Sequence, residues 1–200
     1  FYDSGTIDHV WTVIDNGSGT MRIRNMNSGK VLGVPNMSTA NSAAVVQFTD
    51  NGTIDHVWQL VPDGQVRIQN RNSGKVLAVN NMSMADSAQV QQFADNGTAD
   101  HLWTFVADPS GAWRIRNMNS GKVLGVSNMS TANSAAVVQF TDNGTTDHLW
   151  RLLPAGGQWL RIQNVNSGKV LGVSTMSMAD SADVVQYDDN GTADHLWQLI

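Results

Sequence analysis

The stretch DNGTIDHVW, residues 50–58, decides how this sequence is interpreted, because variants of it recur along the whole chain. The other copies read SGTIDHVW (4–11), DNGTADHLW (95–103), DNGTTDHLW (142–150) and DNGTADHLW (189–197). All five histidines of the protein lie in these copies, each between an Asp and a hydrophobic residue that precedes a Trp. A motif that recurs in this way has three possible roles: a repeated active site, a repeated binding site or a repeated part of the hydrophobic core.

The motif marks a sequence repeat. Its tryptophans are separated by 47, 45, 47 and 47 residues and are Trp11, Trp58, Trp103, Trp150 and Trp197. A period of this length is typical of a supersecondary unit that cannot bury its apolar face alone. Four full units of about 47 residues are present, at roughly 14–60, 61–105, 106–152 and 153–199, and residues 1–13 are the end of a fifth.

Within one unit, hydrophobic residues alternate with a period of two, which is typical of half-buried strands. In MRIRN (21–25), Met21 and Ile23 alternate with two arginines. VLGV (31–34), VVQF (45–48) and HVWQL (56–60) read as three more strands, separated by turns rich in Asn, Ser and Gly. We therefore predict an all-β chain with four short strands in each unit and no helix.

The repeat as a whole resembles a known family. RIRNMNSGKVLGV, followed by STANSAAVVQFTDNGTIDHVWQL, is similar to one repeat of the ricin B-chain type β-trefoil lectins, also called family 13 carbohydrate-binding modules, and particularly to their bacterial branch. The resemblance covers essentially the whole chain, four times over. It implies a β-trefoil, in which three units close around a pseudo-threefold axis and leave few free sheet edges.

A trefoil takes three repeats, whereas this chain has four repeats and one additional strand. We predict that residues 61–200 form the complete ricin-type β-trefoil. Residues 1–60 would then be the end of a preceding repeat plus one ricin-type repeat, in a partial or swapped trefoil. A four-bladed β-propeller-like closure is the alternative. In the trefoil we expect the motif tryptophans Trp58, Trp103, Trp150 and Trp197 to be buried.

Composition narrows the classes of function. Acidic residues outnumber basic ones by 17 to 12, and no run of Lys or Arg exists, so a basic stripe that would follow nucleic-acid phosphates is lacking. No apolar stretch approaches the length that spans a bilayer, and we expect no membrane insertion. The absence of cysteine excludes disulfides, thiolate metal sites and cysteine nucleophiles.

The family resemblance points to sugar sites but leaves their state open. In the family, the position of Gly33 is usually an Asp that accepts hydrogen bonds from sugar hydroxyls. This chain has Gly33, Ala78, Gly125 and Gly172 there. Either the sites are degenerate, or the loss of the Asp widens the pocket and the sugar is anchored elsewhere. The family's sugar-stacking aromatic is matched by Phe48, Phe93, Phe140 and Tyr187, and Asn36, Asn81 and Asn128 lie on the adjoining loop.

The Asp-His pair is a poor candidate for chemistry. Catalysis would require a nucleophile or an activated water within hydrogen-bond reach, and no unit offers a distinctive Ser or second carboxylate around the pair. One Asp and one His are too few ligands for zinc. We therefore predict no catalytic residue, no metal and no cofactor. We expect the Asp to face the aromatic ring and accept hydrogen bonds from a sugar, while the His points inward and satisfies backbone groups.

The predicted sugar-binding residues are Phe48, Asp55, His56, Phe93, Asp100, His101, Phe140, Asp147, His148, Tyr187, Asp194 and His195. The expected function is that of a non-catalytic carbohydrate-binding lectin or module, whose weak sites gain avidity on a polysaccharide or glycan. The resemblance also implies a secreted, extracellular protein. The alternative is a structural, self-assembling extracellular protein with degenerate sugar sites that associates through its unpaired repeat.

Overall fold

The computed structural model describes residues 5–17 and 19–200, and the chain divides into two compact units, 1–60 and 61–200. Throughout the described residues the regular structure is β-strand, joined by 3₁₀ turns of three residues each, and none of these residues lies in an α-helix. No helix in this described part of the chain could cross a membrane. The predicted all-β class is confirmed.

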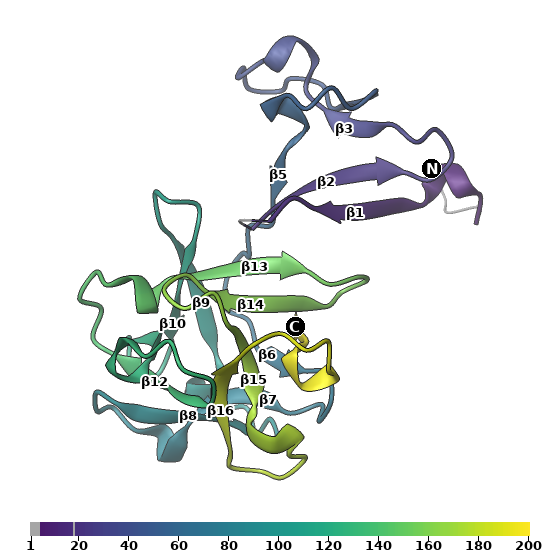
Figure 1. The fold of residues 1–200 in the computed structure, drawn as a ribbon. Helices are drawn as coiled ribbons and strands as arrows, with labels where there is room; N and C mark the ends of the chain where they lie inside the picture. The colour runs from purple at the N-terminus through teal and green to yellow at the C-terminus, as the bar shows by residue number, and fades with distance from the viewer. Residues whose placement is uncertain (1–4, 18) are drawn as a thin grey trace. The chain divides into compact units, whose positions relative to one another are not determined.

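Residues 61–200 form a β-trefoil (Figure 1). Its strands are β6 (Ile68–Asn70), β7 (Val76–Val79), β8 (Ala88–Phe93), β9 (Trp103–Ala107), β10 (Trp113–Asn117), β11 (Val123–Val126), β12 (Ala135–Phe140), β13 (Trp150–Pro154), β14 (Leu160–Asn164), β15 (Val170–Val173), β16 (Ala182–Tyr187) and β17 (Trp197–Leu199). Strands β9, β10, β13, β14, β17 and β6 pair in that order, and a bridge between Val66 and Trp103 closes the ring. Three repeats thus make one six-stranded barrel, and a four-bladed closure is not formed.

Three hairpins cover one end of this barrel. They are β7–β8, β11–β12 and β15–β16, and their second strands pair with one another in a triangle. Alternating residues from barrel and cap fill a single core, in which Trp103, Trp150 and Trp197 are fully buried. Each indole N–H donates to the backbone carbonyl of a Leu in its own repeat, as from Trp150 to Leu124 at 2.9 Å. A buried indole therefore keeps its polar group satisfied.

The described residues of the unit 1–60 form five strands equivalent to strands of the trefoil, but these strands do not close into a barrel. They are β1 (Trp11–Asp15), β2 (Thr20–Asn25), β3 (Val31–Gly33), β4 (Val46–Phe48) and β5 (Trp58–Gln59), in an open sheet in which β5 pairs with β2. The prediction that all four motif tryptophans are buried is wrong for Trp58, which is only half-buried. The reason is that the repeats that would cover it in a closed trefoil are not part of this unit.

The motif itself is not a plain strand. Ile54–His56 (η3), Ala99–His101 (η5), Thr146–His148 (η7) and Ala193–His195 (η9) are 3₁₀ turns, and the strand begins only at the Trp. The prediction of a strand over 56–60 is therefore wrong at His56, Val57 and Leu60, because the strand covers only Trp58 and Gln59. A 3₁₀ turn places side chains by a period of three rather than two, which lets Asp and His lie in the same pocket.

Candidate sugar-binding pockets

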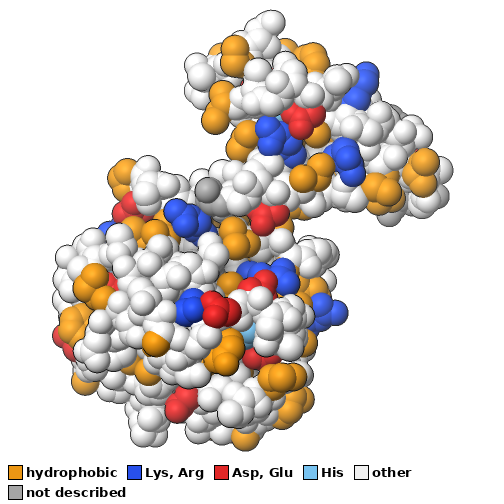
Figure 2. All heavy atoms as spheres, in the orientation of Figure 1, with side chains coloured by type: hydrophobic (Ala, Val, Ile, Leu, Met, Phe, Trp, Pro, Cys, Tyr) orange, Lys and Arg blue, Asp and Glu red, His pale blue; other side chains and the backbone are white. Residues whose placement is uncertain are grey.

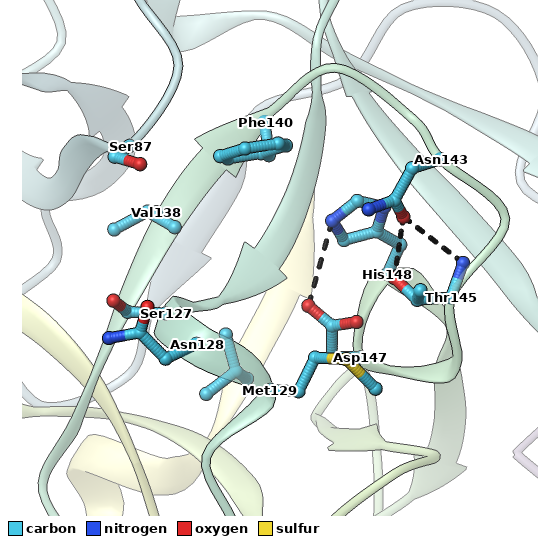
Figure 3. Close-up of a pocket in the computed structure, with 11 residues that line it drawn as sticks. Ser87, Ser127, Asn128, Met129, Val138, Phe140, Asn143, Thr145, Asp147 and His148 are labelled. Carbon is cyan, nitrogen blue, oxygen red and sulfur yellow. Dashed lines mark hydrogen bonds and ion pairs between the residues drawn. The ribbon is translucent and has the colours of Figure 1, made fainter.

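Each repeat contains one pocket built from equivalent residues. In the third repeat it has a volume of about 150 Å³ and is lined by Phe140 at the end of β12, by Asp147 and His148 of η7, and by Asn128 and Met129 of η6 (Ser127–Met129) (Figure 3). The pockets of the first, second and fourth repeats measure about 240, 300 and 280 Å³. All twelve predicted sugar-binding residues line these four pockets.

The sequence D-N-G-T forms the turn that presents the Asp-His pair. In the third repeat, Asp142 Oδ1 accepts a hydrogen bond from the Gly144 N–H, and Asn143 Oδ1 accepts bonds from the N–H and hydroxyl of Thr145. Gly144 has a φ of +81°, a conformation that a residue with a side chain rarely adopts. The turn is thus fixed by local side-chain contacts before the chain enters η7.

The histidine lies between two carboxylates. His148 Nδ1 is 3.4 Å from Asp142 Oδ1, and Nε2 is 3.6 Å from Asp147 Oδ2. Asp142 in turn binds Arg114, whose Nε is 2.7 Å from Oδ2. The same Arg–Asp–His–Asp chain recurs in every repeat, with Arg22 and Asp50, Arg67 and Asp95, and Arg161 and Asp189 in the first two places.

Sequence reasoning missed the first Asp and the Arg of this chain. Their signal is nevertheless present, because an Asp lies six residues before each of these histidines and each RI[RQ]N segment begins with an Arg. Burial raises the pKa of Asp142, but the Gly144 N–H, Arg114 and His148 together outweigh it, so the pKa lies below its ordinary value. Asp142 is therefore a carboxylate at neutral pH and holds the imidazole in place.

The predicted inward position of the histidine is found, but the ring nitrogens of His148 face the carboxylates of Asp142 and Asp147 and not the backbone groups that were expected. The consequence for the pocket was not foreseen. A β-carbon on Gly172 would lie 2.5 Å from Cδ2 and 2.9 Å from Nε2 of His195. The imidazole thus fills the space beside the glycine, and the expectation that losing the family's Asp widens the pocket is wrong. In the second repeat the position is Ala78, and there the His101 ring is tilted by 43° to Phe93, compared with 36° for the pair Phe140 and His148.

The aromatic ring and the imidazole form one wall of the pocket. Phe140 and His148 have ring centroids 6.1 Å apart, and Tyr187 and His195 6.2 Å. The rings at 48 and 187 are exposed, by 40% and 38%, and those of Phe93 and Phe140 are half-buried. A partly exposed aromatic face gives a sugar ring a flat apolar surface on which to stack.

A buried carboxylate faces this wall. Asp100, Asp147 and Asp194 are each 3% exposed, and the Oδ1 atoms of all three, and of Asp55, have no hydrogen-bond partner in the described structure. Buried polar atoms are normally paired, because an unpaired one costs about 1–3 kcal/mol. These carboxylate oxygens are thus unpaired acceptors near the aromatic ring, and they are almost inaccessible to solvent in this conformation.

Two further features complete the pockets of the trefoil. The rim residues Asn36, Asn81, Asn128 and Thr175 have φ values between +52° and +56°, in the left-handed region. In addition, a serine from a neighbouring repeat lines each trefoil pocket: Ser181 beside Phe93, Ser87 beside Phe140, and Ser134 beside Tyr187. In residues 5–17 and 19–200, no serine from another repeat lines the Phe48 pocket. Sequence reasoning missed these serines because a contact between repeats leaves no local signal.

Known proteins with similar sequences define the family. A model described as ricin-type β-trefoil lectin domain-like matches residues 8–93, 99–187 and 146–199. The chain belongs to this family. The predicted resemblance is therefore confirmed, and the repeats are ricin-type repeats. Comparison with curated proteins yields no match.

Solved structures show the same fold. The designed threefold-symmetric protein ThreeFoil is 35% identical, with a TM-score of 0.68 over 69% of this chain and 99% of that one. An exo-β-1,3-galactanase from Clostridium thermocellum is 23% identical, with a TM-score of 0.67 over 94% of this chain and 45% of the galactanase. A ricin B-like lectin from Macrolepiota procera, solved with lactose, is 18% identical, with a TM-score of 0.60 over 71% of this chain and 98% of the lectin.

Proposed function

We propose that this chain is a non-catalytic carbohydrate-binding protein with one weak site in each ricin-type repeat. The observation that carries the proposal is the repeated pairing of an accessible aromatic ring with a buried carboxylate oxygen that lacks a partner, as in Phe140 and Asp147. The ring supplies the stacking surface and the carboxylate supplies a charge-assisted acceptor for a sugar hydroxyl. The Macrolepiota procera lectin, whose structure contains lactose, supports the same class of ligand.

A binding role fits the histidine better than a chemical one. Both of its ring nitrogens face carboxylates, at 3.3–3.4 Å on one side and 3.6 Å on the other in the second and third repeats. An imidazole held in this way is oriented as a wall and has no nitrogen directed at a substrate proton. We therefore assign His101 and His148 the role of positioning the carboxylate and the ring.

Several weak sites act together on a polymer. Pockets of this size, about 150–300 Å³, take one or two sugar units and bury little ligand surface. Because the second contact of a polymeric ligand is intramolecular, binding to a polysaccharide is tighter than binding to its monosaccharide. The proposal therefore includes an extracellular setting, where glycans and polysaccharides are found.

The test is binding of neutral sugars and of polysaccharides to the full chain, by calorimetry and by pull-down. The triple variant Phe93→Ala, Phe140→Ala, Tyr187→Ala should lose most of the binding, since it removes the stacking ring of every trefoil pocket. Phe105→Ala is the matched control, because its ring packs edge-on against Trp113 and lies outside the pockets. Binding that is undiminished in the triple variant would reject the three aromatic pockets of the trefoil as sites.

A structural, self-assembling role is the second candidate. It is favoured by the large apolar side chains that residues 5–60 leave exposed, including Ile7, Val45 and Ile54. Hydrophobic side chains on the molecular surface are drawn in orange in Figure 2. If no sugar binds at millimolar concentration while chains associate in solution, this candidate replaces the lectin.

A further inference from the structure

One segment occurs almost unchanged in both units. Residues 22–58 and 114–150 are each 37 residues long and differ at three positions, Pro35/Ser127, Ile54/Thr146 and Val57/Leu149. The second copy lies inside the closed trefoil, and the first lies in the open unit. Because the two sequences are nearly the same, differences in burial between the copies arise from their surroundings and not from their amino acids.

The residues that differ in burial are those at the contacts between repeats. Val137 is fully buried and Val45 is 52% exposed. Gln139 is fully buried, and its side-chain amide donates to the carbonyls of Ser83 and Ala85 in the preceding repeat. Gln47, the equivalent residue, is exposed. The open unit thus presents, on its surface, a set of groups that in the trefoil is satisfied by a neighbouring repeat.

Residues 5–11 already supply part of one neighbouring repeat. Residues 5–11 read GTIDHVW, as do residues 52–58. Asn25 Nδ2 donates to the Asp8 carbonyl at 2.7 Å and Trp11 pairs with Asn25, which reproduces the contacts of Asn117 with Asp100 and with Trp103 in the trefoil. Residues 5–15 therefore occupy the place of the last strand of a preceding repeat.

This placement decides which partner fits. A second copy of this chain would bring its own residues 52–58 to the place that 5–11 already fill, so it could dock only by displacing them. What remains uncovered corresponds to one whole ricin-type repeat and to a second repeat without its Asp-His-x-Trp strand. We propose that residues 5–60 bind a polypeptide of that kind, and that the complex is a second closed trefoil.

Binding of this partner has a consequence for the Phe48 pocket of the first repeat. In the closed trefoil each serine at the equivalent of Ser42 lines the pocket of the next repeat, and each pocket receives such a serine from the repeat before it. The partner would therefore complete the Phe48 pocket with its own serine, and Ser42 would line a pocket of the partner. The docking of a partner on residues 5–60 does not depend on whether these pockets bind sugar.

The probe for the experiment is a polypeptide with the sequence of residues 106–187, which is one whole repeat and a second one without its Asp-His-x-Trp strand. Sedimentation of the full chain with this probe should give a one-to-one complex at micromolar concentration, with a blue shift of tryptophan fluorescence as Trp11 and Trp58 become buried. Val45→Asp should weaken this association at least tenfold, and it leaves the free chain folded because Val45 is exposed there. Thr39→Asp is the matched control, since the equivalent Thr131 stays exposed in the trefoil.

A second measurement covers the case in which the probe does not stay soluble. Residues 106–186 are joined directly in front of residues 1–60, which gives three consecutive repeats in one polypeptide, and its thermal unfolding is followed. A single cooperative transition that Val45→Asp lowers and Thr39→Asp does not supports the proposal. The proposal is overturned if the probe does not bind and the three-repeat polypeptide unfolds non-cooperatively. It is also overturned if the full chain associates with itself and Val45→Asp weakens that association, because a second copy would then be the partner.

Discussion

The imidazole of His148 lies against the α-carbon of Gly125, so that a β-carbon on this glycine would come within 2.5 Å of Cδ2 of the histidine. The strand β11 and the turn η7 approach one another here as closely as a glycine permits. The imidazole thereby fills the space that a side chain at position 125 would take.

Substitutions at Gly125 should follow the size of the side chain. Gly125→Ala should be tolerated, because Ala78 occupies the equivalent position in the second repeat, where His101 is buried as His148 is. Gly125→Val should lower the free energy of unfolding of the trefoil by about 1–3 kcal/mol, the usual cost of overpacking, and should weaken sugar binding in that pocket. Thermal unfolding and calorimetry check both effects. Equal stability of the alanine and valine variants would show that the histidine is not confined.

The carboxylate should contribute to binding more than to folding. Asp100→Asn, Asp147→Asn and Asp194→Asn, combined in one chain, keep the shape of the pockets but remove the charge of the acceptor. Affinity for a monovalent sugar should fall by about 1 kcal/mol at each site, roughly fivefold. The exposed Asp63→Asn serves as control. If the triple variant binds as the wild type does, the unpaired Oδ1 atoms are not the ligand contacts.

The pocket of the first repeat should be the weakest of the four. Among the residues that the structure describes, it is lined by Asn36, Met37, Phe48, Asn51, Thr53, Asp55 and His56, and by no serine from a neighbouring repeat. Phe48→Ala should therefore change the total heat of sugar binding less than Phe140→Ala does. A larger loss with Phe48→Ala would mean that the contribution of the neighbouring serine is unimportant.

Acid should destabilise the trefoil through Asp108. The hydroxyl and N–H of Ser110, followed by Arg114, lower the pKa of Asp108 from 3.8 to about 2. A carboxylate with a depressed pKa in the folded state stabilises the protein fully above the unfolded pKa, and this stabilisation is lost as pH falls from about 4 towards 2. Thermal unfolding between pH 6 and pH 2 should show this decline. Asp108→Asn should be less stable at pH 6 and should decline less; a parallel decline in both proteins contradicts the assignment.

The alternation of hydrophobic residues predicted the strands, and the resemblance of the repeat to ricin-type repeats predicted the family and the main residues of each pocket, because these features depend on local sequence that repeats. The half-buried Trp58 was not predicted, since the sequence around it is nearly the same as that around Trp150, and the two residues differ mainly in the repeats that surround them. The contact of Gly125 with His148 and the serines that cross between repeats were also not predicted. They depend on the spacing of strands from different parts of the chain, which no single segment encodes.

The central claim, that these pockets bind sugar, is tested most directly through the histidines. Four of the five line a pocket, and His9 serves as an internal reference because it lies in the partial repeat at 5–15. In an NMR titration with neutral mono- and disaccharides at millimolar concentration, the ring signals of His101, His148 and His195 should shift and saturate together, while those of His9 stay unchanged. If the His101, His148 and His195 signals do not move with any sugar, or if they move only in step with His9, the account is contradicted.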